Sequence, residues 1–550
     1  MFIKRKVKNI LTVTIKDGLN NIKNEGGNRK VNKEILRKAK EEKGITLVAL
    51  VITIIVLLIL AGITLSMVLG PNGIIDRAKQ AKEQTEGAAL NEQEILNGVD
   101  SYINEQLSGT NSNSSSVKKD GSFDTAKGVN SPKITGTGLK PVYFNGEEKV
   151  YLTEASSKEE WDKWYSYSEN NPVWANAESS DGSLWVWIPR YAYKITSNLG
   201  TGTKGNIDVV FVDIKNKNNG TTYLATYPTV SNNAMEDYVV HPAFINDSAN
   251  GYVNGGWKED IPGIWVAKYA AGFQNSTVGE DTKQVSYSNL PYTELNGYSS
   301  NFLETTLTKN TTKMSYPVFK SNTYAYNIIS VGDAFLLAKE IGKASMYGLS
   351  NMDSHLMKNS EWGAVAYLAQ SKYGRNGNEI TINSKNLNNS IYVNNASSGT
   401  KANVYAVTGY GNKDTANDVS ASTTNNMSGI FDLSGCVWER VAGYFKGGAA
   451  STPTWHNSMA SSSTSESSEY LTLYESYGDH YGDAVKETSG SSSSTSGSWN
   501  RDYSNFVSSS SPVFNRGGNY GSGSIAGSFA FDKYYGIPTY SYGFRAVLVP

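Results

Sequence analysis

The chain has 550 residues, of which 39% are hydrophobic and 18% charged, and its 50 Lys and Arg almost balance its 51 Asp and Glu. The length exceeds one ordinary domain, and the charge balance does not favour a general nucleic-acid binder, which carries a basic face. One cysteine and four histidines exclude a disulfide framework and a cysteine-based zinc site, and the sequence has no P-loop, dinucleotide-binding or G-x-S-x-G motif.

The N-terminal part of the chain carries the clearest pattern. Residues 1–43 are basic, with 13 Lys and Arg against 5 Asp and Glu, and residues 45–69 contain no charged side chain. As a helix the second segment is long enough to cross a ~30 Å hydrocarbon layer, and its apolar residues lie on every side, unlike those of an interfacial helix. The positive-inside rule predicts a single-pass membrane anchor, with residues 1–44 as a cytoplasmic leader and the remainder outside the cell.

Lys43 and Gly44 stand directly before this apolar segment. The junction resembles the prepilin cleavage site of type IV pilins and pseudopilins. The resemblance implies that a prepilin peptidase cuts between Gly44 and Ile45, that residues 45–107 form one pilin-like transmembrane and extended helix, and that pilus or secretion machinery is a partner. The family usually has Glu five residues after the cut, and Ala49 in this chain favours cleavage over incorporation into a filament shaft. An uncleaved signal anchor is the alternative.

The remaining sequence predicts an ectodomain made of short elements. Residues 108–132 are rich in Ser, Asn and Gly, which predicts a flexible linker, and residues 133–550 follow as the ectodomain. Aromatic and β-branched runs predict strands, helical spacing predicts two helices, and a Ser-rich stretch predicts a long surface loop. The strands are expected at 185–195, 207–214 and 263–273, the helices at 330–342 and 359–374, and the loop at 489–511. This mixture predicts an α+β fold with much irregular structure.

Tyrosine is unusually frequent, with 35 Tyr against 16 Phe and 11 Trp. Tyr, Ser, Asn and Gly together are typical of binding surfaces, where rigid rings and small adaptable polar groups contact a partner. A tyrosine-rich extracellular fold without a ligand is the alternative that composition leaves open.

Four segments occur in a fixed order: 359–370 (NSEWGAVAYLAQ), 429–445, 514–529 and 542–549. Together they resemble the formylglycine-generating-enzyme, or sulfatase-modifying-factor, family, which implies a C-type-lectin-like fold for the ectodomain. Read physically, large buried rings, glycines at tight backbone positions and an internal ion pair between Glu439 and Arg516 or Arg545 would hold such a fold together. The residues expected to be scaffold are Trp362, Trp438, Glu439, Arg516, Gly517, Gly518, Gly543, Phe544 and Arg545.

The catalytic part of that family is not matched. Its enzymes use two copper-binding cysteines, whereas this chain has only Cys436, expected to be a small buried residue. A non-catalytic domain without a cofactor is therefore predicted; calcium is a possibility that no Asp-rich loop requires. Two alternatives remain. One is an enzyme with a non-standard site, for which Asp432, Glu439, His456 and His480 are the candidate acids and bases, and the other is an inert structural subunit.

Residues 515–545 also resemble the C-terminal variable region of lectin-fold proteins diversified by retroelements, in which R-G-G, A-G-x-F and G-F-R are fixed and the residues between them change. The resemblance implies a binding region over 498–545 that recognises an external protein or glycan ligand. The residues expected to contact the ligand are Trp499, Tyr503, Asn519, Tyr520, Ser522, Ser524, Ser528, Asp532, Tyr534, Tyr535, Tyr540 and Tyr542.

Overall fold

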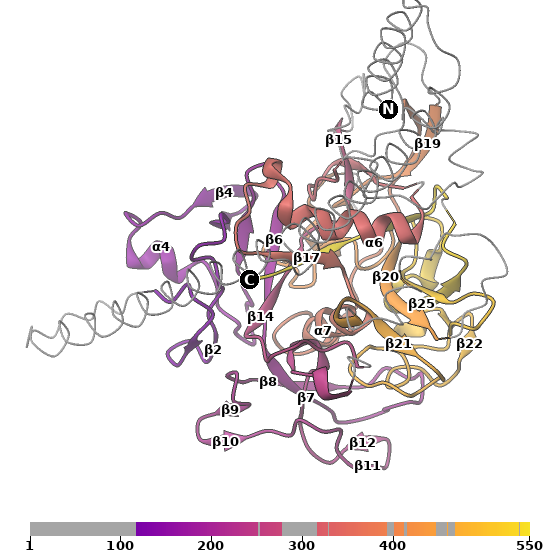
Figure 1. Ribbon diagram of the computed structural model, residues 1–550, viewed down its shortest axis with the longest axis horizontal. Helices are drawn as coiled ribbons and strands as arrows, with labels where there is room; N and C mark the ends of the chain where they lie inside the picture. The colour runs from indigo at the N-terminus through magenta and orange to yellow at the C-terminus, as the bar shows by residue number, and fades with distance from the viewer. Residues whose placement is uncertain are drawn as a thin grey trace, which may run out of the picture. The chain divides into compact units, whose positions relative to one another are not determined.

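A computed structural model provides the structure of the protein (Figure 1). The chain divides into two compact units, residues 1–115 and 116–550. The described residues all belong to the second unit: 117–250, 254–277, 316–327, 329–392, 401–411, 415–446, 459, 468–537 and 539–550. The leader, the apolar segment and the prepilin-like junction at Gly44 and Ile45 lie outside them.

The described residues are mostly β-structure. The α-helices among them are short: α4 (Lys158–Asp162), α6 (Val331–Glu340) and α7 (Asn359–Gln370). In this part of the chain, no helix combines the length and apolar character needed to cross a membrane. The described unit is mostly β, which corrects the predicted α+β fold class, and no described helix supports the predicted pilin-like transmembrane helix or the single-pass membrane localisation, whose residues 45–107 lie outside this part of the chain. Gly, Asn and Ser interrupt the apolar runs every few residues, which leaves strands and turns rather than long helices.

The first large sheet has seven strands, and every neighbouring pair is antiparallel. In spatial order they are β17 (Asp353–Leu356), β27 (Ala546–Val549), β14 (Gly263–Ala267), β6 (Leu184–Pro189), β5 (Asn176–Glu178), β3 (Lys140–Asn145) and β4 (Glu148–Tyr151). The last strand of the chain, β27, thus pairs between two strands from its middle. Chain closure of this kind ties the C-terminus into the core.

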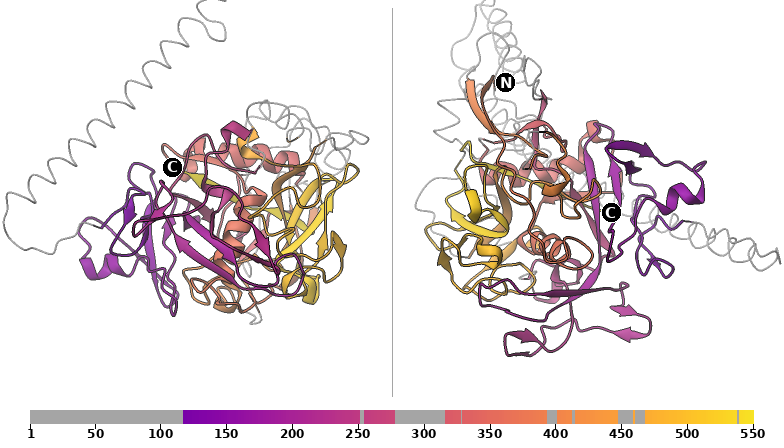
Figure 2. Two further views of the ribbon diagram at one scale, coloured as in Figure 1. Left: turned by 90° about the horizontal axis from the view of Figure 1, so that it is seen from below. Right: turned by 180° about the vertical axis from the view of Figure 1, so that it is seen from behind.

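The second large sheet carries the C-terminal segments. Its strands are β21 (Thr472–Tyr474), β20 (Trp438–Phe445), β24 (Val513–Gly517), β25 (Gly527–Tyr534), β23 (Ser504–Asn505) and β22 (Ser493–Ser494), and β26 (Tyr542–Phe544) pairs in parallel with β20. Helix α7 lies between the two large sheets (Figure 1, Figure 2). All twelve of its residues are buried, as expected for a helix enclosed on every side.

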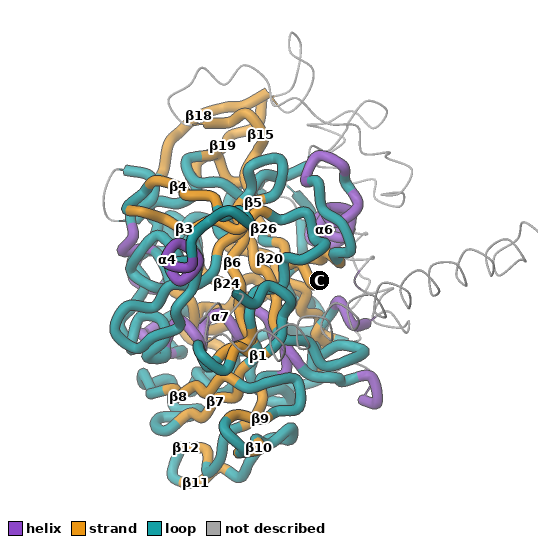
Figure 3. Tube along the Cα trace, turned by 90° about the vertical axis from the view of Figure 1, so that its left-hand side faces the viewer, coloured by secondary structure: helices purple, strands orange, loops and turns teal. Residues whose placement is uncertain are grey.

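Smaller elements complete the unit. A three-stranded sheet consists of β13 (Val239–Val240), β7 (Tyr191–Ile195) and β8 (Ile207–Phe211). The two-stranded pairs are β1 (Phe123–Asp124) with β2 (Val129–Asn130), β9 (Lys217–Asn218) with β10 (Thr221–Thr222), β11 (Val230–Ser231) with β12 (Ala234–Met235), β15 (Gly272–Thr277) with β16 (Thr323–Ala325), and β18 (Asn386–Tyr392) with β19 (Lys401–Ala406). Figure 3 shows β9 to β12 at one end of the unit and β15, β18 and β19 at the opposite end.

Short 3₁₀ turns connect these elements: η1 (Pro242–Phe244), η2 (Ser248–Asn250), η3 (Ile341–Lys343), η4 (Ser345–Tyr347), η5 (Val419–Ala421), η6 (Ser468–Tyr470), η7 (Trp499–Arg501) and η8 (Gly523–Ile525). Both predicted helices are present as α6 and α7, each ending a few residues before its expected end. The predicted strand 185–195 is two strands, β6 and β7, which belong to different sheets. Arg190 lies between them, fully buried, and its guanidinium donates to the carbonyl of Ile261 and pairs with Asp260 at 3.0 Å.

Two segments expected to be loops are integrated into the fold. The second unit begins at Ser116, inside the predicted linker 108–132, and the indole of Trp187 donates to the carbonyl of Asn130 at 3.1 Å. In the predicted surface loop 489–511, Trp499 is fully buried and packs edge-on against Phe529, with ring centroids 5.3 Å apart. The polar composition of both segments gave no sign that they belong to the folded unit, because the contacts that hold them are made with residues far away in the sequence.

Asp502, in the same segment 489–511, makes the stability of the protein depend on pH. Its buried carboxylate accepts from the amide of Phe529 at 2.9 Å, and burial raises its pKa from 3.8 to about 8. The folded protein holds a proton that the unfolded chain releases, so this stability is complete below about pH 4 and is lost as pH rises through about 8. Asp502→Asn is expected to reduce the loss of unfolding free energy with rising pH. The measurement is urea unfolding at several pH values, followed by tryptophan fluorescence. The exposed Glu159→Gln is the control, and an unchanged pH profile for the Asp502 variant would contradict the assignment.

Candidate ligand-binding surface

Strand β25 presents alternate side chains to two environments. Phe529 and Phe531 point into the core and are fully buried, whereas Ala530, Asp532 and Tyr534 belong to the opposite face. Pairing with β24 and, through it, with β20 brings side chains from three strands onto that outer face. The alternation of period two therefore decides which of the predicted binding residues reach the outside of the sheet.

Four aromatic side chains gather on this outer face, Trp438, Tyr503, Tyr534 and Tyr542, and Tyr535 follows directly after β25; together the five are here called the tyrosine face. Tyr534 stacks on Tyr542 with ring centroids 4.8 Å apart, and it contacts Tyr535 at 5.5 Å. Trp438 packs edge-on against Tyr503 at 6.1 Å. Tyr535 is 49% exposed, while Tyr542 is only 8% exposed and supports Tyr534 from the inside. Rings held this way keep one orientation when a partner binds.

A second group of rings continues from the tyrosine face through the loop before β26. Tyr540 is 51% exposed and packs edge-on against Tyr405 at 5.3 Å, and Tyr520 lies 6.0 Å from the same ring. Tyr405 belongs to β19, far from the predicted binding region in the sequence. Sequence reasoning missed it because only the fold brings that strand beside residues 520–540.

A row of polar side chains crosses the sheet beneath these rings. Arg440, Asn515 and Asp532 are register partners on β20, β24 and β25. Asp532 accepts from the amide of Asn505 at 2.8 Å, and the Arg440 guanidinium lies 5.0 Å from the Tyr542 ring. Within the described residues, Arg440 Nε and Nη1 and both amide atoms of Asn515 are buried without a hydrogen-bond partner. Burial lowers the pKa of Arg440 to about 10. The sequence carried no signal for Arg440 or Asn515.

The other predicted contact residues are distributed differently. Asn519 and Ser522 bond to each other in the turn after β24, where the Ser522 hydroxyl accepts from the Asn519 amide at 2.9 Å. Ser524 is exposed in η8. Ser528 is 8% exposed, and Trp499 is part of the core. The predicted set therefore splits into exposed rings, turn residues and buried residues.

The residues expected to be scaffold are all buried, and they lie in strands or in α7 except for Gly518, just after β24, and Arg545, between β26 and β27. Of the two arginines considered as partners of Glu439, Arg545 forms the pair, with Nε to Oε2 at 2.9 Å and Nη2 to Oε1 at 2.5 Å. The Arg516 guanidinium lies 5.7 Å from the Trp362 ring, beneath the second sheet. Gly517 has a φ of +87°, a conformation that side chains rarely adopt, which explains a glycine there.

The groups considered for catalysis are held in structural roles. Cys436 is fully buried, and burial raises the pKa of its thiol well above 9.0. Asp432 accepts from the Gly409 amide and the Asn383 side chain, both at 2.8 Å. His480 is 9% exposed, and His456 lies outside the described residues. Among the residues that the structure describes, no three His, Cys, Asp or Glu side chains gather as a metal-binding group.

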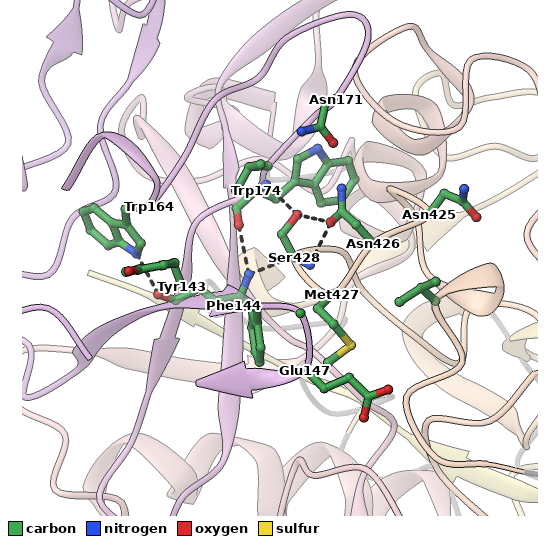
Figure 4. A pocket seen from close by; sticks show the side chains of 14 residues that line it. Tyr143, Phe144, Glu147, Trp164, Asn171, Trp174, Asn425, Asn426, Met427 and Ser428 are labelled. Carbon is green, nitrogen blue, oxygen red and sulfur yellow. Dashed lines mark hydrogen bonds between the residues drawn. The ribbon is translucent and has the colours of Figure 1, made fainter. Parts of the chain in front are cut away.

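One pocket lies apart from every predicted contact residue and has a volume of about 390 Å³. It is formed by the β3–β4 hairpin, by residues 164–176 and by residues 419–428, and its aromatic side chains are Tyr143, Phe144, Trp164 and Trp174 (Figure 4). We refer to it as the aromatic pocket. Sequence reasoning missed it, because its walls come from segments about 250 residues apart.

Comparisons with known proteins add little. No family model and no curated protein matches the chain. Among solved structures, a chain described as "Major Tropism Determinant P3c Variant" is similar at 13% sequence identity with a TM-score of 0.21, over 76% of this chain and 73% of that one. This distant likeness fits the expected lectin-like class only weakly, and at this TM-score it carries no argument about fold or function.

Proposed function

We propose that residues 116–550 form a non-catalytic binding domain that captures a protein or glycan ligand through the tyrosine face and the neighbouring Tyr520 and Tyr540. The observation that carries the proposal is the exposure of two rings, Tyr535 at 49% and Tyr540 at 51%, in the connection between β25 and β26, next to a sheet whose other face is core. Exposed patches of large apolar side chains are typical of interaction sites.

The support beneath these rings favours binding over a passive surface. Tyr534 and Tyr542 are stacked, so Tyr535 loses little conformational freedom when it contacts a ligand. The hydroxyls of tyrosines remain available for hydrogen bonds at the edge of an apolar contact.

The positions that match the fixed residues of the retroelement-diversified proteins differ in exposure from those that match the changeable residues. Arg516, Phe529 and Phe544 are fully buried, whereas Tyr535 and Tyr540 are half exposed. Tyr542 and Ser528 do not follow the separation, since each is 8% exposed. The separation supports a surface that tolerates sequence change around a constant core, as the resemblance to retroelement-diversified proteins implies.

The test is a double substitution, Tyr535→Ala with Tyr540→Ala, in the complete protein. Probes are a printed glycan array and a phage library of random peptides, screened first with the unaltered protein. Binders selected this way are expected to lose at least about tenfold in affinity, the equivalent of about 1.4 kcal/mol, when both rings are removed. The matched control is Tyr151→Ala, because Tyr151 is 45% exposed on β4, outside the tyrosine face. Equal losses in both variants, or none in either, would overturn the proposal.

A further inference from the structure

The aromatic pocket is a second ligand site, and it shares no lining residue with the tyrosine face. We infer that it binds a neutral saccharide unit, through aromatic surfaces for the ring's C–H faces and through polar groups at its rim for the hydroxyls. This inference does not depend on the proposed function of the tyrosine face. It follows from four properties of the pocket: a rigid wall, polar groups without partners, the placement of charges and its size.

The wall is rigid before any ligand arrives. The Ser428 hydroxyl donates to Asn426 Oδ1 at 2.6 Å and accepts from the Trp174 amide at 3.0 Å, and the Asn426 amide donates to the carbonyl of Pro172 at 2.8 Å (Figure 4). Asn176 bonds to the carbonyls of both Trp174 and Ser428. These bonds join two distant segments of the chain into one surface. A preformed wall lowers the entropy cost of ligand binding.

The rim offers hydrogen-bonding groups that the described protein leaves unused. The side chains of Glu147 and Asn171 line the pocket and are exposed, and neither makes a hydrogen bond within the described residues, nor does the hydroxyl of Tyr143. Asn425 Oδ1 accepts from Arg375 at 2.6 Å, which leaves its N–H groups available. Carboxylate, amide and phenol groups together can accept from and donate to several hydroxyls.

Apolar surface lies between these polar groups. Tyr143, Phe144 and Val419 are half-buried among the lining residues, so part of their apolar surface is open to a ligand, while Trp174 and Met427 are buried beside them. A sugar ring has apolar C–H faces and an edge that carries hydroxyls. Aromatic surface alternating with single hydrogen-bonding groups is therefore complementary to it.

The placement of charges favours a neutral ligand. The ammonium of Lys268 lies 4.8 Å from the Phe144 ring, and that of Lys163 lies 5.7 Å from the Tyr143 ring. Each ring thus already has one cation near it, which disfavours a second, cationic guest but not an uncharged one. Glu147 is the one ionisable acid among the lining residues, and it would repel an anion. The volume of about 390 Å³ lies at the small end of ligand pockets, which suits one or two sugar rings.

The experiment measures binding of neutral mono- and disaccharides (glucose, galactose, N-acetylglucosamine, lactose and cellobiose) to the complete protein by saturation-transfer NMR and calorimetry. At least one sugar is expected to bind, and Glu147→Ala and Asn171→Ala are each expected to weaken it at least about fivefold, as the loss of a hydrogen bond implies. The matched control is Glu148→Ala, because Glu148, the first residue of β4, is an exposed carboxylate next to Glu147 that does not line the pocket. Glu148→Ala is expected to bind like the unaltered protein.

Each other outcome overturns the inference. No binding by any sugar, or binding that Glu147→Ala leaves intact, rules out a saccharide at this pocket. Tighter binding of a lysine-containing peptide that depends on Glu147 would make the pocket a peptide site. Sugar binding lost in the Tyr535→Ala, Tyr540→Ala protein alone would place the sugar on the tyrosine face, which removes this inference and supports the proposed function. Failure of the tyrosine-face test leaves the sugar titration and its Glu148 control unaffected.

Discussion

Replacing Glu439 by Gln is expected to lower the free energy of unfolding by about 3–5 kcal/mol, because it leaves the buried Arg545 without its counter-charge. Both side chains are fully buried, and the guanidinium also donates to the carbonyls of Ala267 at 2.6 Å and Phe431 at 2.8 Å. The ion pair thus connects Glu439 on β20 with Arg545, which lies between β26 and β27. Through the two carbonyls, Arg545 also connects to β14 and to the loop before β20. Burial raises the pKa of Glu439 to about 7, although Arg545 opposes the shift.

The measurement is urea unfolding of Glu439→Gln, Arg545→Met and the double variant Glu439→Leu with Arg545→Met. Each single variant is expected to be strongly destabilised, and the double variant less than the sum, because it leaves no unpaired charge. Lys158→Met breaks the exposed pair with Asp162, where N and O are 2.6 Å apart, and little change is expected there. Single variants that unfold like the unaltered protein would show that the pair carries no stability.

Gly363→Ala is expected to destabilise the protein by about 3 kcal/mol, at the upper end of overpacking effects. Helix propensity alone gives the opposite sign, a gain of about 1 kcal/mol for Ala over Gly inside a helix. In the structure, a Cβ at Gly363 would lie 1.9 Å from the carbonyl oxygen of Gly482 and 2.7 Å from the Cα of Asp483. The Gly482 amide donates to the buried Glu487 carboxylate at 2.6 Å, so that loop cannot move away.

The control for this substitution is Gly521→Ala in the exposed turn after β24. Its Cβ would meet nothing nearer than Asn519 Oδ1 at 3.5 Å, so the stability is expected to change by less than about 0.5 kcal/mol. Thermal unfolding followed by calorimetry distinguishes the two variants. A Gly363 variant as stable as the unaltered protein would show that α7 is less tightly enclosed than the structure indicates.

Predictions that rested on local pattern held best. The helix at 359–370 follows from its apolar residues at helical spacing, despite Gly363 in its interior, and the burial of Trp362 and Phe544 follows from the cost of exposing large rings. Glu439 needed a buried partner of opposite charge, and two arginines qualified. Strand register did not decide between them, because Arg516 on β24 is the direct register partner of Glu439, yet the Arg545 guanidinium forms the ion pair and that of Arg516 lies 5.7 Å from the Trp362 ring.

Predictions that treated composition as structure failed. Ser-rich flanks made Trp499 look like a surface residue, yet the ring packs on Phe529 and is fully buried. The α+β fold class failed because the two predicted helices, although present as α6 and α7, are short elements in a unit made mostly of strands and turns. The aromatic pocket had no local signal at all, since residues 172–176 and 426–428 become neighbours only in the folded chain.

The sequence by itself determined what each short stretch can do: which faces alternate, where helix α7 begins, which large side chains must be buried, and which region is rich in tyrosine. Those are local properties, set by backbone sterics and by the free energy of burying apolar surface. Only the tertiary structure decided which tyrosines are exposed, which arginine meets Glu439 and whether Gly363 can carry a side chain. Each of these depends on contacts between residues far apart in the chain, and no local pattern encodes such contacts.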